Sequence, residues 1–137
     1  MTDAFVPSPA DVVWNRASAD LGEGVGDRHL RVLLLVHGMM CNGGPNHVAD
    51  SYGAEIPAAA EACRYFGLDA LAALMLQLPA AASGYEDEDV EARLSGAYYE
   101  LVPDDATISD AFEARYAEAP EDFDPITEAN VPPVRLD

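Results

Sequence analysis

A leucine-rich stretch, residues 27–40, constrains the fold of this chain more than any other feature of its sequence. The stretch is long enough for a helix, and it lacks the alternation of apolar and polar residues that is typical of a half-buried strand. As a helix it would be apolar on nearly all sides, and such a helix has to lie at the centre of its domain. The only run with a strand-like composition, residues 32–36, lies inside this stretch, so we expect a helical protein.

Glycines and prolines divide the rest of the chain into segments with helical spacing. The turn Cys41-Asn42-Gly43-Gly44 suits left-handed backbone conformations and is predicted to end the central helix sharply. Gly67 is predicted to stop a later helix, and Thr107 with Asp110 resembles a capping box at the start of the last one. The other helices are expected over residues 9–21, 45–52, 57–66, 68–78, 86–101 and from 107 onward.

The predicted fold is all-α, a single compact domain of about six to seven helices with an extended, proline-rich C-terminal tail. We expect the acidic helical domain to span residues 1–119 and the acidic tail to span residues 120–137, where four prolines forbid a long helix. The glycines of residues 22–26 are predicted to close the first helix and to form a flexible linker, and residues 80–85 to form a loop. Of the adjacent Tyr98 and Tyr99, one ring is expected in the core and one at the surface.

The charge of the chain is strongly negative, with 25 acidic residues, seven arginines, no lysine and a formal net charge of −18. A duplex carries its own phosphates and would repel such a chain, which excludes nucleic acid as a direct partner and favours a basic protein. Residues 1–83 hold nine acids and four arginines, a net of −5, whereas residues 84–137 hold 16 acids and three arginines, a net of −13. We therefore predict that the partner binds the acids of one helix and its two ends, namely Glu86, Asp87, Glu88, Asp89, Glu91, Glu100, Asp104 and Asp105.

Two simpler explanations of this charge stay open. Acids in the first turn of a helix interact favourably with its dipole, and acidic runs are usually just solvated. A chain with many acids, abundant alanine and no lysine would also suit high salt, where self-repulsion is screened. A salt-adapted protein should lose structure at low salt, whereas an acidic binding protein should stay folded there and release its partner as the salt rises.

The sequence offers little chemistry for catalysis or for metal binding. The spacing of His37, Cys41, His47 and Cys63 matches no established zinc pattern, and the two cysteines are interpreted as buried thiols in a reducing compartment. No nucleophile elbow or phosphate-binding loop is present, so we expect a protein that is not an enzyme and has no cofactor. The start of the chain has no signal-peptide pattern and no apolar run reaches membrane-spanning length, which favours a cytoplasmic protein.

The segment from Val12 to Leu78 resembles a known family. It contains Val13-Trp14-Asn15, the leucine-rich stretch, the Asn42-Gly43-Gly44 turn, Ser51-Tyr52-Gly53 and an alanine-rich helix that ends in Phe66-Gly67. These features are similar to the bacterial family of acidic helical proteins called domain of unknown function 4375, whose best-known member is a DNA mimic. The sequence departs from the family after the glycines, where it has Pro45-Asn46-His47-Val48 in place of a bulky aromatic residue followed by Gln and Tyr.

The resemblance implies an all-helical fold, a homodimer, no cofactor, and a role in occupying the DNA-binding surface of a basic nucleic-acid-binding protein such as a transcription factor. B-DNA carries one charge per about 1.7 Å of axis, so 18 charges correspond to about 30 Å of duplex, within the roughly 35–40 Å diameter expected of such a domain. The alternative is an immunity or antitoxin-type protein that neutralises a toxin by shape and apolar contacts.

Overall fold

The computed structural model describes residues 8–81 and 88–126, with the side chain of residue 88 left out. The described residues form six α-helices and three short 3-10 helices and contain no strand, which confirms the predicted all-α fold. In chain order, the elements are α1 (Pro9–Ser18), α2 (Val25–Ser51), η1 (Gly53–Glu55), α3 (Ile56–Tyr65), α4 (Asp69–Met75), η2 (Leu78–Ala81), α5 (Glu88–Leu101), α6 (Ala106–Glu118) and η3 (Pro120–Asp122).

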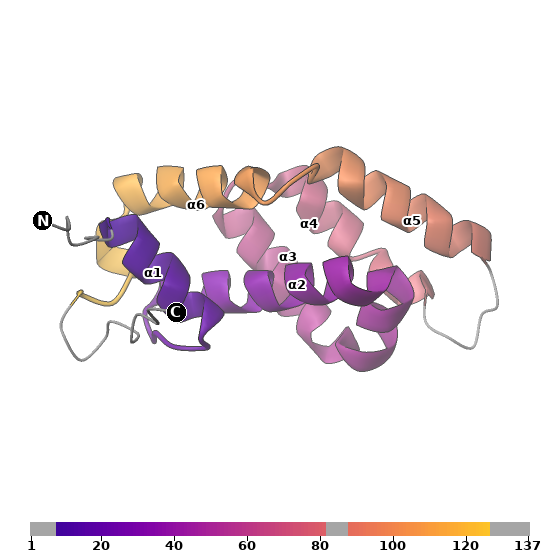
Figure 1. The fold of residues 1–137 in the computed structure, drawn as a ribbon, viewed down its shortest axis with the longest axis horizontal. Helices are drawn as coiled ribbons and strands as arrows, with labels where there is room; N and C mark the ends of the chain where they lie inside the picture. Colours follow the sequence, from indigo (N-terminus) through magenta and orange to yellow (C-terminus); the bar gives the residue numbers. More distant parts are fainter. Residues whose placement is uncertain (1–7, 82–87, 127–137) are drawn as a thin grey trace, which may run out of the picture.

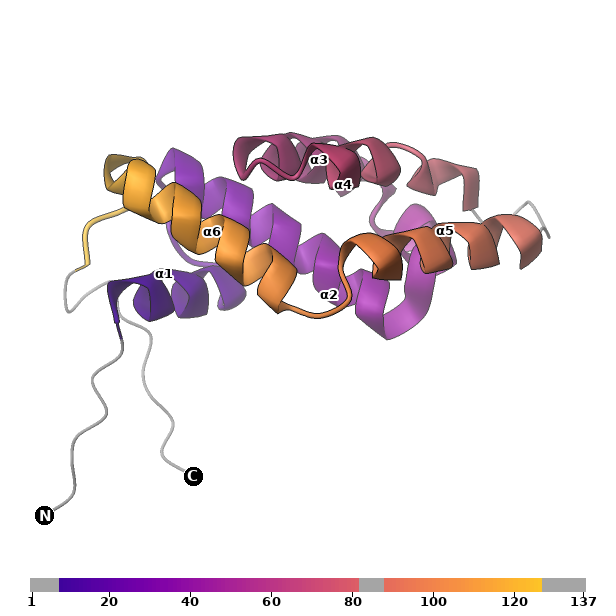
Figure 2. The same ribbon diagram turned by 90° about the horizontal axis from the view of Figure 1, so that it is seen from above.

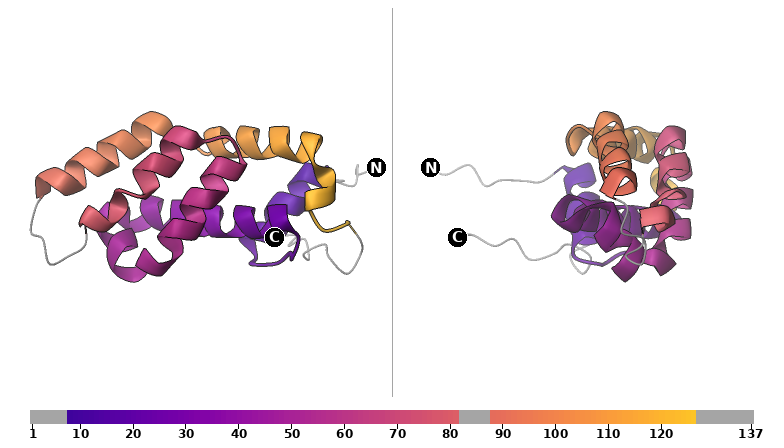
Figure 3. Two further views of the ribbon diagram at one scale, coloured as in Figure 1. Left: turned by 180° about the vertical axis from the view of Figure 1, so that it is seen from behind. Right: turned by 90° about the vertical axis from the view of Figure 1, so that its right-hand side faces the viewer.

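The helices are arranged around α2, which runs along the long axis of the molecule (Figure 1). Seen from above, α6 and α5 follow one another along the same axis, and α1 lies beside α6 at one end (Figure 2). The view from behind shows α3 and α4 side by side on the face opposite α1 (Figure 3). The longest helix is therefore covered on several sides, as its apolar sequence predicts.

The central helix buries the residues that the sequence assigned to it. Leu30, Leu33, Val36 and Met40 are spaced by three or four positions and are almost completely buried, while Leu35 is 39% exposed. At Gly44 the backbone leaves the helical conformation (φ 79°, ψ −175°) and Pro45 begins a second helical segment. This bend confirms the predicted sharp end of the helix at the glycine pair. Glycine suits the position because a side chain at this φ would be strained.

One predicted helix end differs from the structure and another agrees with it. We expected residues 9–21 to form a helix closed by glycines, but α1 ends at Ser18 and the left-handed residue is Asp20 (φ 63°), followed by a hydrogen bond from Leu21 N to Arg16 O of 2.8 Å. A short polar side chain tolerates this conformation. Gly67 (φ 77°) confirms the predicted stop of α3, with Leu68 N donating to Cys63 O at 2.7 Å.

The capping box was predicted at the wrong helix. It is formed by Ser8 and Asp11 at the start of α1, where each side chain accepts a hydrogen bond from the backbone N–H of the other residue. Thr107 is not a cap, because α6 already begins at Ala106, whose N–H donates to the Asp104 side chain at 2.9 Å.

The glycines between α1 and α2 are a packing site, and the interpretation as a flexible linker is incomplete. A Cβ atom on Gly26 would lie 2.4 Å from the ring of Phe123, and one on Gly24 would lie 2.5 Å from the carbonyl oxygen of Asp122. Phe123 is 4% exposed and belongs to the core. Of the predicted tail, Phe123 thus packs against the helices, whereas residues 127–137 lie outside the described part and the proposed boundary at residue 120 stays a prediction.

Candidate partner-binding surface

Exposed carboxylates follow α5, the α5–α6 connection and α6. Between residues 88 and 122 the sequence has 11 acids and two arginines, and the two helices lie one after the other along one edge of the molecule (Figure 1). We call six exposed acids of this edge the acidic ridge: Asp89, Glu100, Asp104, Asp105, Asp110 and Glu113.

The ridge is a consequence of how these two helices are anchored. Leu94 and Tyr98 of α5, and Ile108 and Phe112 of α6, are spaced by four residues and are buried. Residues on the same face of a helix recur every three or four positions, so burying these pairs turns Asp110 and Glu113 outward. A rigid pair of helices therefore holds the carboxylates in place.

The structure places four of the eight predicted binding residues at this edge. Asp89, Glu100, Asp104 and Asp105 are exposed there. Glu88 begins α5, but its side chain, like all of Glu86 and Asp87, lies outside the described residues. Asp110 and Glu113 were not predicted as binding residues, although their spacing of three on a helix with a buried opposite face was a usable signal.

Glu91 has a structural contact that the sequence did not suggest. Its side chain is half-buried, and its Oε2 accepts a hydrogen bond of 2.7 Å from the backbone N–H of Asn46. Asn46 is the second residue after the Gly44 bend, where backbone N–H groups lack helical partners. Glu91 therefore ties α5 to the bend in α2, and its carboxylate is partly satisfied within the chain.

A buried histidine supports the connection between α5 and α6. His37 of α2 lies between two partners, with Nε2 2.8 Å from Asp105 Oδ1 and Nδ1 2.6 Å from the Tyr98 hydroxyl. A carboxylate only accepts, so Nε2 donates to it, and in the tautomer whose single proton is on Nε2 the Nδ1 atom accepts from the Tyr98 hydroxyl. Burial raises the pKa of Tyr98, which keeps this hydroxyl protonated. Tyr98 is fully buried and Tyr99 is 43% exposed, as predicted.

Cys41 lies beside this histidine without forming a catalytic pair. Its Sγ is 3.9 Å from Nδ1 and 3.8 Å from Nε2 of His37, both of which are occupied by Tyr98 and Asp105. A base that activates a thiol needs a free nitrogen within about 3.2 Å along the bond to be formed. Cys41 is also exposed, so the prediction of two buried thiols is correct only for Cys63, whose pKa burial raises to about 12.

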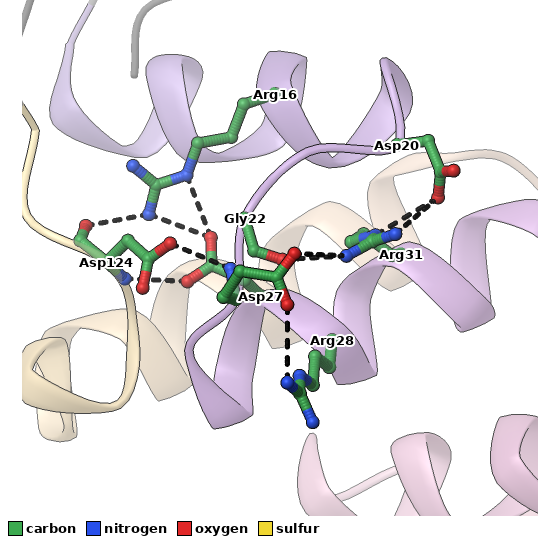
Figure 4. Close-up of polar contacts among 8 residues, drawn as sticks. Arg16, Asp20, Gly22, Asp27, Arg28, Arg31 and Asp124 are labelled. Carbon is green, nitrogen blue, oxygen red and sulfur yellow. Dashed lines mark hydrogen bonds and ion pairs between the residues drawn. The ribbon is translucent and has the colours of Figure 1, made fainter. Parts of the chain in front are cut away.

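Arginine ion pairs among the described residues engage acids at other places. Arg31 binds Asp20 at 2.9 Å and Glu23 at 3.6 Å, and Arg28 binds Glu23 at 3.2 Å (Figure 4). At the end of α6, Arg115 lies 3.8 Å from both Glu118 and Asp122. Within the described part of the chain, Glu100, Asp110 and Glu113 take part in none of these pairs, which leaves the ridge negative.

A buried ion pair fixes the first helix and the C-terminal segment relative to α2. Arg16 and Asp27 are both fully buried, with Nε and Nη2 of the arginine 2.8 Å from Oδ1 of the aspartate (Figure 4). Asp27 Oδ2 accepts from Asp124 N at 2.6 Å, and Arg16 Nη2 also donates to Asp124 O at 2.7 Å. Because residues 119–124 continue directly from α6, this network also fixes the C-terminal end of that helix.

A second cluster holds η3 against α3. The Tyr65 hydroxyl donates to Asp122 Oδ2 at 2.6 Å, and the Arg115 guanidinium carbon lies 4.4 Å from the centre of the Tyr65 ring. Burial and the hydrogen bond to Asp122 raise the pKa of Tyr65 to about 12. The charged groups of Arg115 and Asp122 therefore make their contacts with other residues of the chain.

The described residues contain neither a metal-binding cluster nor a helix that could span a membrane. No three His, Cys, Asp or Glu side chains within residues 8–81 and 88–126 are grouped so that they could hold a metal ion. None of the helices in that part of the chain combines the length and the apolar character that crossing a bilayer requires.

Comparison with known proteins identifies one family. Residues 25–131, well over half of the chain, match the family model described as DMP19-like protein. No curated protein and no solved structure matches the chain significantly.

Proposed function

Since the chain belongs to the DMP19-like protein family, we propose that it acts as a DNA mimic, whose acidic ridge occupies the DNA-binding surface of a basic nucleic-acid-binding protein. The observation that carries the proposal is the set of exposed carboxylates along α5 and α6, of which Glu100, Asp110 and Glu113 take part in none of the ion pairs described above. In this proposal the chain binds its partner and catalyses no reaction.

The dimensions of the ridge agree with this role. Helices α5 and α6 have 14 and 13 residues, which at 1.5 Å per residue amounts to about 40 Å of helix laid end to end. This is the length of about a dozen base pairs of B-DNA. A basic surface shaped for a short stretch of duplex could therefore meet carboxylates at both parts of this length, with Asp89 near the start of α5 and the other five ridge acids between Glu100 and Glu113.

The rigidity of the scaffold supports the same proposal. The Arg16–Asp27 pair, the contact of Glu91 with Asn46 and the contact of His37 with Asp105 fix the two helices to α2. Carboxylates that are already in place lose little conformational freedom on binding, which favours affinity.

The family likeness also implies a homodimer, which light scattering over a range of protein concentrations would test.

The test is competition with DNA for a common partner. A candidate partner is purified on the immobilised chain at about 50 mM salt, where electrostatic attraction is weakly screened, and is then bound to a labelled duplex. We expect the chain to displace the duplex, with an affinity that falls steeply as the salt rises. Failure to recover any basic protein that DNA also binds would contradict the proposal.

Two triple variants separate the ridge from total charge. Glu100→Gln/Asp110→Asn/Glu113→Gln removes three ridge acids, and Glu61→Gln/Asp69→Asn/Glu121→Gln removes three exposed acids elsewhere, so that each changes the formal net charge from −18 to −15. We expect the ridge variant to displace the duplex at least about tenfold less well and the control to lose less than about threefold. Equal losses would refute the ridge, and salt-insensitive binding without competition by DNA would favour the toxin-neutralising alternative.

A further inference from the structure

A hollow between α1 and α6 lies at one end of the acidic ridge. It has a volume of about 200 Å³, below the roughly 300–1,000 Å³ of ordinary small-molecule pockets and suited to a single long side chain. The two helices lie beside each other at this end of the molecule (Figure 2). The hollow is lined by Ala10, Asp11, Trp14, Ser109, Phe112 and Glu113.

The lining combines aromatic rings with exposed carboxylates. The rings of Trp14 and Phe112 are 5.8 Å apart between centroids and tilted by 53°, and Phe112 is almost completely buried beneath the half-buried indole. Asp11 and Glu113, one from each helix, are exposed at the same hollow. Its walls therefore offer a π face and negative charge together.

Neither carboxylate is neutralised by an arginine of the described residues. Arg16, the arginine of α1, is buried against Asp27, and Arg115, the arginine of α6, contacts Tyr65, Glu118 and Asp122. Among the residues that the structure describes, Asp11 accepts a long hydrogen bond of 3.3 Å from Ser8 N within its own helix cap. The hollow thus has acceptor capacity for a cation that the described part of the chain does not supply.

We propose that this hollow is an anchor site for an arginine side chain of the basic partner. The inference rests on the proposed function for the class of partner and adds the place and the residue type. A guanidinium is planar, stacks on aromatic faces and donates up to five hydrogen bonds, so it can lie against Trp14 while it donates to Asp11 and Glu113. A lysine ammonium is a strongly hydrated point charge and uses such a site less well.

Trp14 is the single tryptophan of the chain, and its fluorescence therefore reports on this hollow alone. The probes are hexa-arginine and hexa-lysine peptides with blocked ends, which carry equal charge, titrated at about 50 mM salt with total binding followed by calorimetry. The variants are Glu113→Gln, which alters the hollow, and Glu61→Gln, which removes one exposed charge from α3, outside both the ridge and the lining of the hollow.

We expect hexa-arginine to change the Trp14 emission saturably and hexa-lysine to change it far less. Glu113→Gln should weaken hexa-arginine binding at least about fivefold, while Glu61→Gln should weaken it less than about twofold, because a charge-assisted contact is lost only in the first. Binding of both peptides with unchanged Trp14 emission, or with equal effects of the two variants, would overturn the arginine site and leave the ridge standing. If neither peptide bound the protein, the proposed function would be overturned as well.

Discussion

Replacing Asp27 by asparagine should remove much of the stability of this protein. The carboxylate is fully buried and accepts from two donors, Arg16 on Oδ1 and the backbone N–H of Asp124 on Oδ2. An asparagine has the same shape, but its amide nitrogen must face one of these donors in either orientation. The variant would therefore lose one hydrogen bond and leave the buried Arg16 guanidinium without a counter-charge.

The expected cost follows from that uncompensated charge. Breaking a buried ion pair by removing one partner costs about 3–5 kcal/mol, against a total stability of about 5–15 kcal/mol for a domain. With a urea dependence of about 2 kcal/mol per molar, the unfolding midpoint should fall by about 2 M. Urea unfolding followed by circular dichroism measures this shift.

The matched control is Asp20→Asn, which breaks the surface pair with Arg31. The Asp20 side chain is 85% exposed, so its loss should cost less than about 1 kcal/mol. In a double-mutant cycle, Arg16→Met and Asp27→Asn together should cost less than the sum of the single changes, because the first removes the charge that the second leaves unpaired. Equal midpoints for Asp27→Asn and Asp20→Asn would refute the assignment of the buried pair as a main anchor of the fold.

Three further predictions concern glycines, thiols and pH. Gly26→Ala should lower the free energy of unfolding by about 1–3 kcal/mol because the new methyl group meets Phe123, whereas the methyl group of Gly38→Ala in the same helix meets nothing and should raise it by about 0.5–1 kcal/mol. A gain in stability of Gly26→Ala, measured by urea unfolding, would contradict the packing of Phe123 against this glycine. At pH 8 a chromogenic disulfide reagent should label one thiol of the folded chain, and none in Cys41→Ser, because Cys63 is buried with a pKa of about 12; rapid labelling of two would contradict the burial. Burial lowers the pKa of His29 below 6.5, so just below that pH the folded chain binds fewer protons than the unfolded chain. The stability that the neutral ring contributes is present above pH 6.5 and is lost as the pH falls. Thermal melts between pH 7 and 5 should therefore show a smaller loss of stability for His29→Gln than for the parent, and parallel curves would contradict the prediction.

Local sequence patterns predicted most elements of the fold. The apolar periodicity of residues 27–40 predicted the central helix, and the glycines at residues 44 and 67 predicted a bend and a stop, because each signal depends on neighbouring residues only. At the first helix the strongest local signal was misleading, since the glycines after Leu21 suggested its end while Asp20 takes the left-handed conformation.

The contacts that position the ridge could not be predicted from local patterns. In the sequence Asp27 was one of nine acids of residues 1–83, and only the approach of α1 and of residue 124 makes it the buried partner of Arg16. Glu91 was predicted to face a partner, and its contact with Asn46 joins residues 45 positions apart. Such contacts follow from packing, on which the charge pattern alone carries no information.

The most direct test of the central claim is to locate where a cationic ligand binds. Amide chemical shifts of the ¹⁵N-labelled protein, recorded with increasing hexa-lysine at about 50 mM salt, report contact residue by residue, and salt screens exposed charges only weakly there. We predict that the largest shifts fall between residues 100 and 113, on α6 and the connection before it. Shifts of equal size around Glu61 in α3 and Asp69 in α4, outside the acidic ridge, would contradict the claim that this edge is the binding surface.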